Sequence, residues 1–228
     1  MSTIYDWLEE NYNITISNKQ VMEDALTHSS YLNENKDFKG SDYERIEFLG
    51  DSIVGMWVAN KLFHHLPVID EGVMTTMRAQ LVCEKSLANF MRKLGIAKYI
   101  KMGVGEEKNG ARNRNSLLAD VFEAFIGALY LNGGVKYINA VLNDTIDIEN
   151  QQALYENTDY KSRIQEYVQS DTRAVLKYEL LSETGPSNNP EFEMGVYLDG
   201  VLLGQGKGRT KKKAEQQAAK EALGKLVK

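Results

Sequence analysis

The stretch LLADVFEAFIGALYLN, at residues 117–132, is almost continuously apolar and carries only two charges, Asp120 and Glu123. A helix that is apolar on every side is usually buried. A carboxylate taken out of water without a partner costs several kcal/mol, unless its pKa rises until it is neutral. Because the two acids are spaced i, i+3, they lie on one helix face and point toward one spot. A cation is expected there, or a buried salt bridge to a basic side chain such as Arg78.

A second acidic cluster lies in SDYERIEFLGDSIVG, at residues 41–55. Glu44, Glu47 and Asp51 fall within an arc of roughly 60° on a helical wheel, so they share one face. Acids on one face repel each other, and a divalent metal bound by oxygen ligands is the usual compensation. The alternative for Glu47 is an ordinary surface pairing with Arg45 or Lys61.

Two residues of this segment also have structural interpretations. Ser41 followed by Glu44 fits a capping box, in which Glu44 would serve only to start the helix. Gly50 lowers helix stability by about 1 kcal/mol relative to alanine, and close approach of the Asp120 helix would explain its presence. That approach would gather four carboxylates around one hard-cation site: Glu47, Asp51, Asp120 and Glu123.

The pattern of the chain changes near residue 149. Before it, apolar residues recur at helical spacing, which predicts an all-α domain over 1–148. A polar stretch at 149–157 is expected to be a linker. In the second domain, over 158–228, we expect a helix at 160–169, strands at 174–181, 192–198 and 201–205, and a helix at 211–226. Asp199-Gly200 would form the hairpin turn between the last two strands.

The composition indicates an ordinary globular protein. No run approaches the roughly 20 apolar residues of a membrane helix, and the acidic N-terminus is unlike a signal peptide. We therefore expect a cytoplasmic protein without membrane contact. The lone cysteine, Cys83, lies within the helical pattern of 77–94 and is expected to be a small buried thiol.

The net charge of −5 argues at first against a nucleic-acid partner. The segment 207–220, however, holds six basic residues and a single acid, Glu215. Thr210 is a good N-cap, yet Lys211 and Lys212 occupy the first helical turn, where the helix dipole disfavours cations. A phosphate group bound at that terminus would resolve the conflict, whereas a solvated lysine run is the alternative.

Several motifs resemble those of the ribonuclease III family. ERIEFLGD (44–51) resembles the family signature, and LADVFEAFIGALYLNGG (118–134) resembles its second acidic helix. LTHSSY (26–31), DEGVMTTMRAQLV (70–82) and GEEKNGARNRNSLLAD (105–120) resemble its other characteristic stretches. Together they extend over most of the first domain. This resemblance implies an all-α endonuclease domain.

The C-terminal region resembles a double-stranded RNA-binding domain through GPSNNPEF (185–192) and GKGRTKKKAEQQAAKEAL (206–223). That likeness implies an α+β domain with the order α-β-β-β-α. Gln165, Glu166 and the loop at 186–190 would enter successive minor grooves, while Lys211 and Lys212 would contact the intervening phosphates. Asn188 departs from the family pattern, because many such domains have histidine or another basic residue there.

The resemblance also assigns roles in the first domain. The metal ligands of the family correspond to Glu47, Asp51, Asp120 and Glu123, with Asp51 and Glu123 as the active-site pair. Glu44 and Glu71 match two further acids that support the cleavage site. Phe48 matches an aromatic residue that enters a pocket of the other subunit in family dimers. His28 is expected to be a hydrogen-bonded structural residue.

These features predict a homodimeric endonuclease that cuts both strands of double-stranded RNA. Mg²⁺, with Mn²⁺ as a substitute, would activate water for attack on the phosphodiester, and no small-molecule cofactor is expected. The resemblance implies 5′-phosphate and 3′-hydroxyl ends with short 3′ overhangs, and a role in processing ribosomal precursor, messenger and other structured RNAs.

Two alternatives remain open. A non-catalytic relative could bind structured RNA as a scaffold, although such relatives tend to lose the four acids. A metal-dependent phosphohydrolase acting on nucleotides would leave the C-terminal domain without a purpose.

Overall fold

The computed structural model describes residues 2–65, 68–148, 160–171, 175–186 and 189–226. The side chains of residues 166 and 169–171 also lie outside the description. The chain divides into two compact units, Met1–Ile148 and Glu149–Lys228, and each is described by itself. The predicted linker, 149–157, lies outside the described residues.

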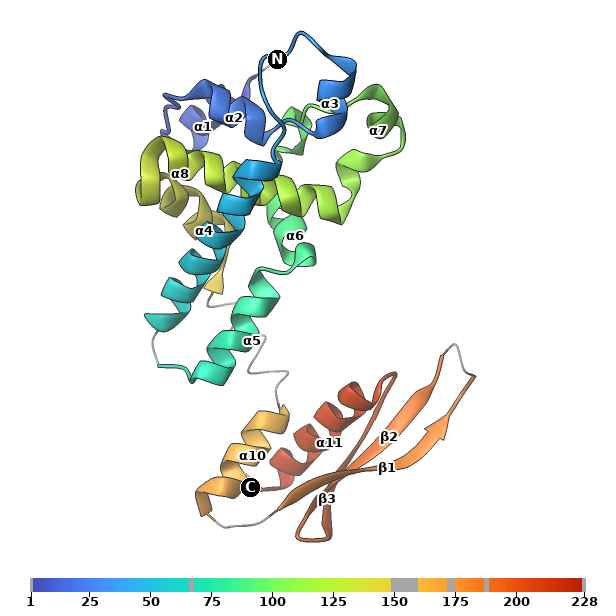
Figure 1. Ribbon diagram of the computed structural model, residues 1–228. Coiled ribbons are helices and arrows are strands. Elements are labelled where there is room, and N and C mark those ends of the chain that lie inside the picture. The colour runs from blue at the N-terminus through green and yellow to red at the C-terminus, as the bar shows by residue number, and fades with distance from the viewer. Residues whose placement is uncertain (1, 66–67, 149–159, 172–174, 187–188, 227–228) are drawn as a thin grey trace. The chain divides into compact units, whose positions relative to one another are not determined.

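The first unit is built from helices (Figure 1). Its α-helices are α1 Ile4–Tyr12, α2 Lys19–Ala25, α3 Ser29–Glu34, α4 Glu44–Phe63, α5 Glu71–Leu81, α6 Glu84–Leu94, α7 Val104–Lys108 and α8 Asn115–Thr145. Two 3₁₀ turns, η1 Ala97–Tyr99 and η2 Ala111–Asn113, connect them. Within 2–65 and 68–148 the only extended pairing is an isolated bridge between Thr27 and Lys101. The prediction of an all-α domain is confirmed.

Helix α8 forms the centre of the first unit. Phe122 and Phe125 are among its fully buried side chains, and α4 and α6 pack along it (Figure 1). The helix is long and apolar enough to cross a membrane, but 56% of its most apolar window is buried inside the unit. Its hydrophobicity is therefore explained by its place in the core. The backbone leaves helical geometry at Gly134, with φ 61° and ψ −150°.

Helices α4 and α8 approach each other through glycines. A Cβ atom added to Gly50 would lie 1.9 Å from the backbone oxygen of Glu123. A Cβ atom added to Gly127 would lie 2.7 Å from the backbone oxygen of Ile46. Both positions therefore require glycine for the observed packing. The expectation that Gly50 marks close approach of the Asp120 helix is confirmed.

The capping box at the start of α4 is not formed, so that prediction is wrong. The helix begins at Glu44 with Tyr43 as its N-cap and without a side-chain cap. The Ser41 backbone N–H and hydroxyl instead donate to the Asp24 carboxylate, at 3.1 and 3.0 Å. A charged acceptor makes stronger hydrogen bonds than a neutral one, so Ser41 bonds to Asp24 instead of capping α4.

The environment predicted for Cys83 is also wrong. The pattern at 77–94 is divided between α5 and α6, and Cys83 is an exposed N-cap residue between them. The hydroxyl of Ser86 donates to the backbone oxygen of Gln80 at 2.6 Å, which secures the break. Helices α5 and α6 each bury their own apolar face, so the apolar spacing in the sequence continues although the helix is interrupted at Cys83.

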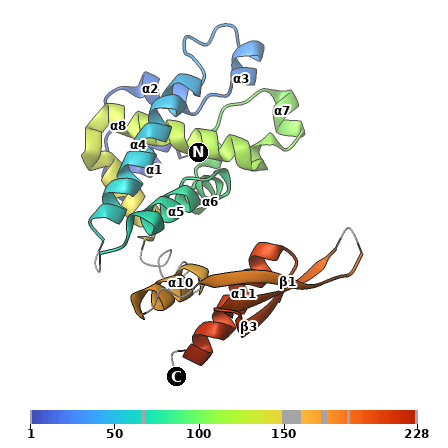
Figure 2. The same ribbon diagram turned by 60° about the horizontal axis from the view of Figure 1, so that its bottom comes forward.

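The second unit has the order α-β-β-β-α (Figures 1 and 2). It consists of α10 Tyr160–Asp171, β1 Leu176–Thr184, β2 Glu191–Leu198, β3 Val201–Gly208 and α11 Lys211–Leu226. The antiparallel sheet has the strand order β1-β2-β3. Asp199 and Gly200 both have positive φ, 47° and 85°, as expected of the predicted hairpin turn. The predicted α+β fold is confirmed.

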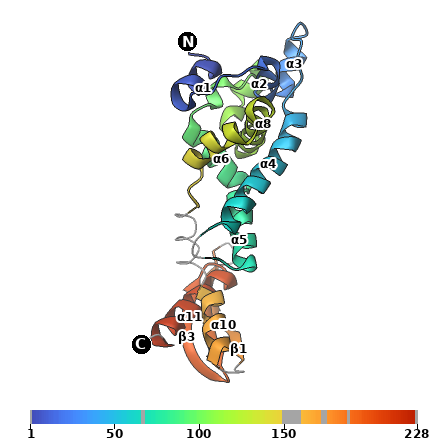
Figure 3. The same cartoon turned by 90° about the vertical axis from the view of Figure 1, so that its left-hand side faces the viewer.

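The core of this unit depends on small residues where α11 meets the sheet (Figure 3). A Cβ atom on Gly206 would lie 2.2 Å from the backbone nitrogen of Ala218, and one on Gly204 would lie 2.5 Å from the backbone oxygen of the same residue. Ile164 and Val168 of α10 and Val196 of β2 complete the buried cluster. Because α11 lies this close to β3, the start of α11 is fixed relative to the sheet.

Candidate functional site

Four acids occupy adjoining parts of α4 and α8. Glu47 and Asp51 are one turn apart on α4, and Asp120 and Glu123 are one turn apart on α8. The contact between Gly50 and the backbone of Glu123 lies between the two pairs. The backbone contact therefore brings together the two helix segments that carry the predicted metal ligands.

Glu123 is the most perturbed of these acids. Burial, followed by the charges of Asp51, Glu47 and Asp120, raises the pKa of its carboxyl to about 8. The pKa of Glu47 is raised by burial first and then by the charges of Asp120, Glu44 and Asp51. The four predicted ligands are thus within electrostatic reach of one another, and at neutral pH Glu123 is mainly protonated.

Asp120 lies beside two residues that sequence reasoning did not connect to it. Burial raises the pKa of its carboxyl, as does the charge of Glu84, whereas His28 and a hydrogen bond from Tyr43 lower it. Tyr43 is buried, and the His28 ring lies 5.9 Å from the Tyr43 ring, centroid to centroid. Burial, followed by the charges of Asp120, Glu47, Glu44 and Asp42, raises the pKa of the Tyr43 phenol.

His28 also has the hydrogen bonds of a structural residue. Its Nδ1 lies 2.7 Å from the hydroxyl of Ser30 and accepts the Ser30 backbone N–H at 3.2 Å. The ring therefore caps the start of α3. This geometry agrees with the structural role expected for His28.

No basic side chain neutralises the four acids within the described part of the chain. The ion pairs found there join other residues, and Arg78 bonds to neither Asp120 nor Glu123. The buried salt bridge considered as an alternative is therefore not formed. Among the described residues Glu47 also forms no ion pair with Arg45 or Lys61, and the Lys61 ammonium lies 5.2 Å from the centroid of the Trp57 ring.

The donor set fits a hard divalent cation by its chemistry. In the described part of the chain none of the four acids has an ion-pair partner, and oxygen ligands are those preferred by Mg²⁺. Among the residues that the structure describes, no group of three or more acidic, histidine or cysteine side chains is arranged to hold a metal ion as it stands. Like charges repel, so uncompensated carboxylates are expected to spread apart and to close when a cation neutralises them.

Glu44, Glu71 and Phe48 occupy different positions in the first unit, and Glu71 is not among the residues whose charges act on the four acids. Glu44 is exposed at the start of α4, and its charge acts on the pKa of Glu47. Glu71 begins α5 and accepts a hydrogen bond from the Thr75 hydroxyl at 2.9 Å. Phe48 is 81% exposed on α4. The roles of all three stay predictions.

Comparison with known proteins gives the family. Residues 18–148 match the family described as Ribonuclease-III-like, and residues 160–226 match the double-stranded RNA binding motif. Ribonuclease 3 of Listeria monocytogenes is 44% identical over 224 residues, which cover 98% of each chain. This chain belongs to the ribonuclease III family. The two matched domains make it an endoribonuclease for double-stranded RNA.

Further relatives agree with this assignment to ribonuclease III. Ribonuclease 3 of Anoxybacillus flavithermus is 46% identical, covering 96% of this chain and 92% of that protein. The solved nuclease domain of ribonuclease III from Campylobacter jejuni is 34% identical with a TM-score of 0.55, covering 64% of this chain and 96% of that one.

The predicted RNA contacts belong to α10, to the loop at 186–190 and to the start of α11. Lys211 and Lys212 are exposed in the first turn of α11, and the Thr210 hydroxyl accepts the Lys213 backbone N–H at 3.2 Å. Thr210 is therefore the side-chain cap that the sequence predicts. Gln165 is half-buried on α10. The side chain of Glu166 and all of Asn188 lie outside the described residues.

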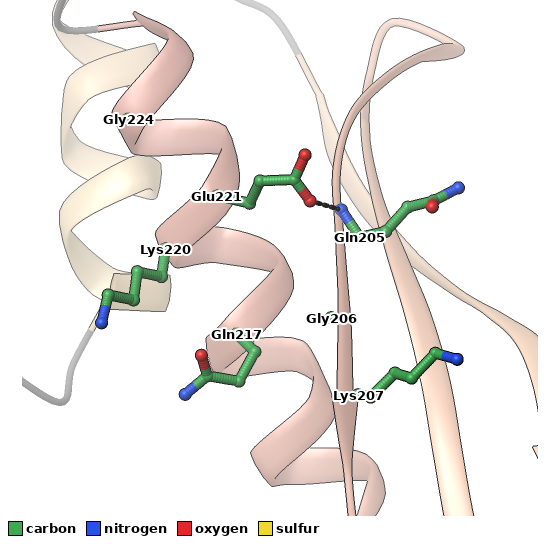
Figure 4. A pocket seen from close by; sticks show the side chains of 7 residues that line it. All are labelled: Gln205, Gly206, Lys207, Gln217, Lys220, Glu221 and Gly224. Atoms are coloured by element: carbon green, nitrogen blue, oxygen red, sulfur yellow. Dashed lines mark hydrogen bonds between the residues drawn. The ribbon is translucent and has the colours of Figure 1, made fainter.

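A shallow groove lies between α11 and the outer edge of β3 (Figure 4). It is lined by Gln205, Gly206, Lys207, Gln217, Lys220, Glu221 and Gly224, and includes none of the predicted RNA contacts. The Glu221 carboxylate accepts the Gln205 backbone N–H at 2.8 Å (Figure 4). This bond satisfies the Gln205 N–H on the edge strand β3, where unpaired backbone N–H groups can pair with a strand of another chain.

Sequence reasoning missed two features of the protein. Tyr43 gave no signal, because an aromatic residue before a helix has many ordinary roles. Lys161 pairs with Glu215 across α10 and α11, at 2.6 Å. Glu215, the isolated acid within the basic segment 207–220, was a signal for that ion pair, but only the folded structure identifies Lys161 as its partner.

Proposed function

We propose that this protein cleaves both strands of duplex RNA with the help of Mg²⁺, for which Mn²⁺ would substitute. Glu47, Asp51, Asp120 and Glu123 would hold the cation. The observation that carries the proposal is the meeting of α4 and α8 at Gly50, next to carboxylates without a basic partner in the described chain. A cation would supply the missing charge.

A divalent cation at such a site lowers the pKa of water and offsets the negative charge of a phosphodiester. The task of the protein is to hold the four acidic side chains in place. Glu123 must release its proton to act as a ligand, because its pKa is raised to about 8. Tyr43 supports Asp120 through the hydrogen bond that lowers the pKa of that acid. Glu44 and Glu71 would support cleavage.

The proposed products carry 5′-phosphate and 3′-hydroxyl ends with short 3′ overhangs. Two staggered cuts require two sites related by a twofold axis, because the strands of a duplex are related in that way. A homodimer would supply both sites, and the spacing between them would set the overhang. The dimer is thus part of the proposed mechanism.

Helix α4 offers an apolar surface for this dimer. Phe48, Met56 and Phe63 are 81%, 50% and 70% exposed. They lie within an arc of about 80° on the helical wheel, next to the acidic face. The solved Campylobacter jejuni nuclease domain is described with structural flexibility in a region involved in dimer formation. We assign Phe48 to the centre of the corresponding contact.

The C-terminal domain would hold the duplex. Gln165 and Glu166 on α10, and the loop that includes Asn188, would face the minor grooves, where 2′-hydroxyls distinguish RNA from DNA. Lys211 and Lys212 would contact phosphates with their ammonium groups at the start of α11. We propose domain limits of 1–148 and 158–228, joined by a linker at 149–157. The expected substrates are ribosomal precursor, messenger and other structured RNAs in the cytoplasm.

Purified protein incubated with a long RNA duplex, with Mg²⁺ or with EDTA, tests this function. Shortening of the duplex only with Mg²⁺ and to 5′-phosphorylated ends supports the proposal. Binding without shortening under both conditions would indicate the non-catalytic scaffold. Hydrolysis of free nucleotides without attack on the duplex would indicate a nucleotide phosphohydrolase.

A further inference from the structure

A bridge of polar contacts joins the start of α10 to the first turns of α11. The ammonium group of Lys161 lies 2.6 Å from the carboxylate of Glu215, and the two side chains are 33% and 22% exposed. The backbone N–H of Lys161 donates to the side-chain oxygen of Gln216 at 3.1 Å. A residue of α11 thus caps a backbone donor in the first turn of α10.

Aromatic rings reinforce the same junction. The Lys161 ammonium lies 4.4 Å from the centroid of the Tyr178 ring on β1. The Lys220 ammonium lies 5.3 Å from the centroid of the Tyr160 ring. Cation–π contacts of this kind add to an ion pair at a partly buried position. Lys161 therefore connects α10 with both α11 and the sheet.

The bridge lies close to every described residue to which we assign an RNA contact. Gln165 follows Lys161 by four residues on α10, and Lys211 precedes Glu215 by four residues on α11. Residues four apart share a helix face and are separated by roughly 6 Å along the axis. Lys212, three residues before Glu215, is also within one turn. The bridge thus joins the two faces that would meet one duplex.

We propose that Lys161 and Glu215 are positioning residues for duplex RNA. Their ion pair sets the separation between the face of α10 that enters a minor groove and the end of α11 that binds phosphates. This inference rests on the proposed function. It explains why an acid stands within a segment whose other charged residues, from 207 to 220, are all basic.

Removing the charge of Glu215 distinguishes a positioning role from a purely electrostatic one, because the two roles predict opposite changes in the affinity for duplex RNA. If Glu215 acted only through its charge, Glu215→Gln would make the surface more positive and would tighten binding to any duplex. If it positions α10, the same change weakens binding to RNA, because minor-groove contacts to 2′-hydroxyls depend on that placement. Binding to a DNA duplex, which relies on phosphate contacts, would not weaken.

The experiment measures the affinity of the full chain for matched RNA and DNA duplexes of about 20 base pairs, long enough for one such domain. EDTA is present to prevent cleavage. We expect Glu215→Gln to weaken RNA binding on the order of fivefold, the effect of losing one partly exposed ion pair, while DNA binding stays equal or tightens. The exchange variant K161E/E215K should restore most of the RNA affinity. Glu179→Gln on β1 makes the same charge change away from the bridge. It should leave the ratio of RNA affinity to DNA affinity unaltered.

Unchanged or tighter RNA binding by Glu215→Gln would overturn the proposal, and so would an equal loss for RNA and DNA. If thermal melting shows that Glu215→Gln is unfolded at the assay temperature, the RNA affinity of the exchange variant K161E/E215K tests the proposal instead. A folded exchange variant without recovered RNA affinity would also overturn the proposal. Failure of the unaltered protein to bind duplex RNA at all would instead refute the proposed function.

Discussion

A Cβ atom on Gly50 would lie only 1.9 Å from the backbone oxygen of Glu123. The contact places a helix backbone directly against the residue whose carboxyl pKa is raised to about 8. The meeting of the two acidic helices is therefore determined by their backbones and not by bonds between their acidic side chains. Any side chain at position 50 must separate α4 from α8.

We expect Gly50→Ala to destabilise the nuclease domain by about 3 kcal/mol or more, because backbone atoms cannot move aside as a flexible side chain can. Cleavage should fall even below the melting temperature, since the two acidic pairs are pushed apart. Thermal melting followed by circular dichroism, with a cleavage assay on the folded protein, measures both effects. Gly72→Ala is the matched control, because Gly72 is exposed on α5 with no atom near its added Cβ. A melting temperature of Gly50→Ala equal to that of the control would contradict this packing.

The stability of the metal-free protein should fall as the pH rises. A carboxyl with a folded-state pKa above its unfolded value stabilises the fold fully below the unfolded pKa, and this contribution is lost as the pH rises through the folded value. For Glu123 the loss extends from about pH 4.5 to about pH 8. In EDTA, Glu123→Gln should therefore raise the melting temperature by a few degrees at pH 9 and have little effect at pH 5.

If Glu123 is a metal ligand, as we propose, a divalent cation must displace its proton. The apparent affinity for Mg²⁺ should therefore increase with pH and level off above about pH 8. Titrations monitored by melting temperature at pH 6, 7, 8 and 9 follow this linkage without requiring cleavage. An affinity independent of pH over that range would show that Glu123 is not a ligand.

Replacing Phe48 should dissociate the proposed dimer without unfolding the subunit. Phe48→Asp places a charge at the centre of the proposed contact, and a side chain 81% exposed in the isolated subunit contributes little to its stability. Light scattering coupled to size-exclusion chromatography should give the mass of one chain for Phe48→Asp and of two chains for the unaltered protein.

The control for this substitution is Val104→Asp, which changes an exposed apolar residue on α7. It should remain dimeric. If Phe48→Asp is a dimer at the same micromolar concentration, the subunits must associate through another surface.

Some features could be predicted from sequence because a residue does not suit the element in which it stands. Asp120 and Glu123 stand in an otherwise apolar run, and Gly50 stands in a helix that it weakens. The meeting of α4 and α8 explains Gly50, and it brings Asp120 and Glu123 close to the acids of α4. The period of two along 192–198 and the Asp199-Gly200 turn likewise predict the sheet, because both are properties of neighbouring residues.

Sequence reasoning was wrong or silent where distant residues compete for the same group. Ser41 bonds to Asp24 instead of capping α4, because a carboxylate 17 residues away is the better acceptor. Cys83 interrupts an apolar periodicity that two separate helices continue. The partners of Glu215 depend on how α10 packs against α11, and local spacing carries no information about that packing.

We propose that the acids of α4 and α8 hold the cation used for cleavage. Asp51→Asn, which preserves the shape of the side chain, tests it most directly when duplex binding in EDTA and cleavage in Mg²⁺ are measured on the same preparation. We predict unchanged duplex affinity and a loss of cleavage of about a thousandfold or more. Cleavage near the unaltered rate would contradict the claim, because Asp51 could not then be a ligand of the catalytic metal.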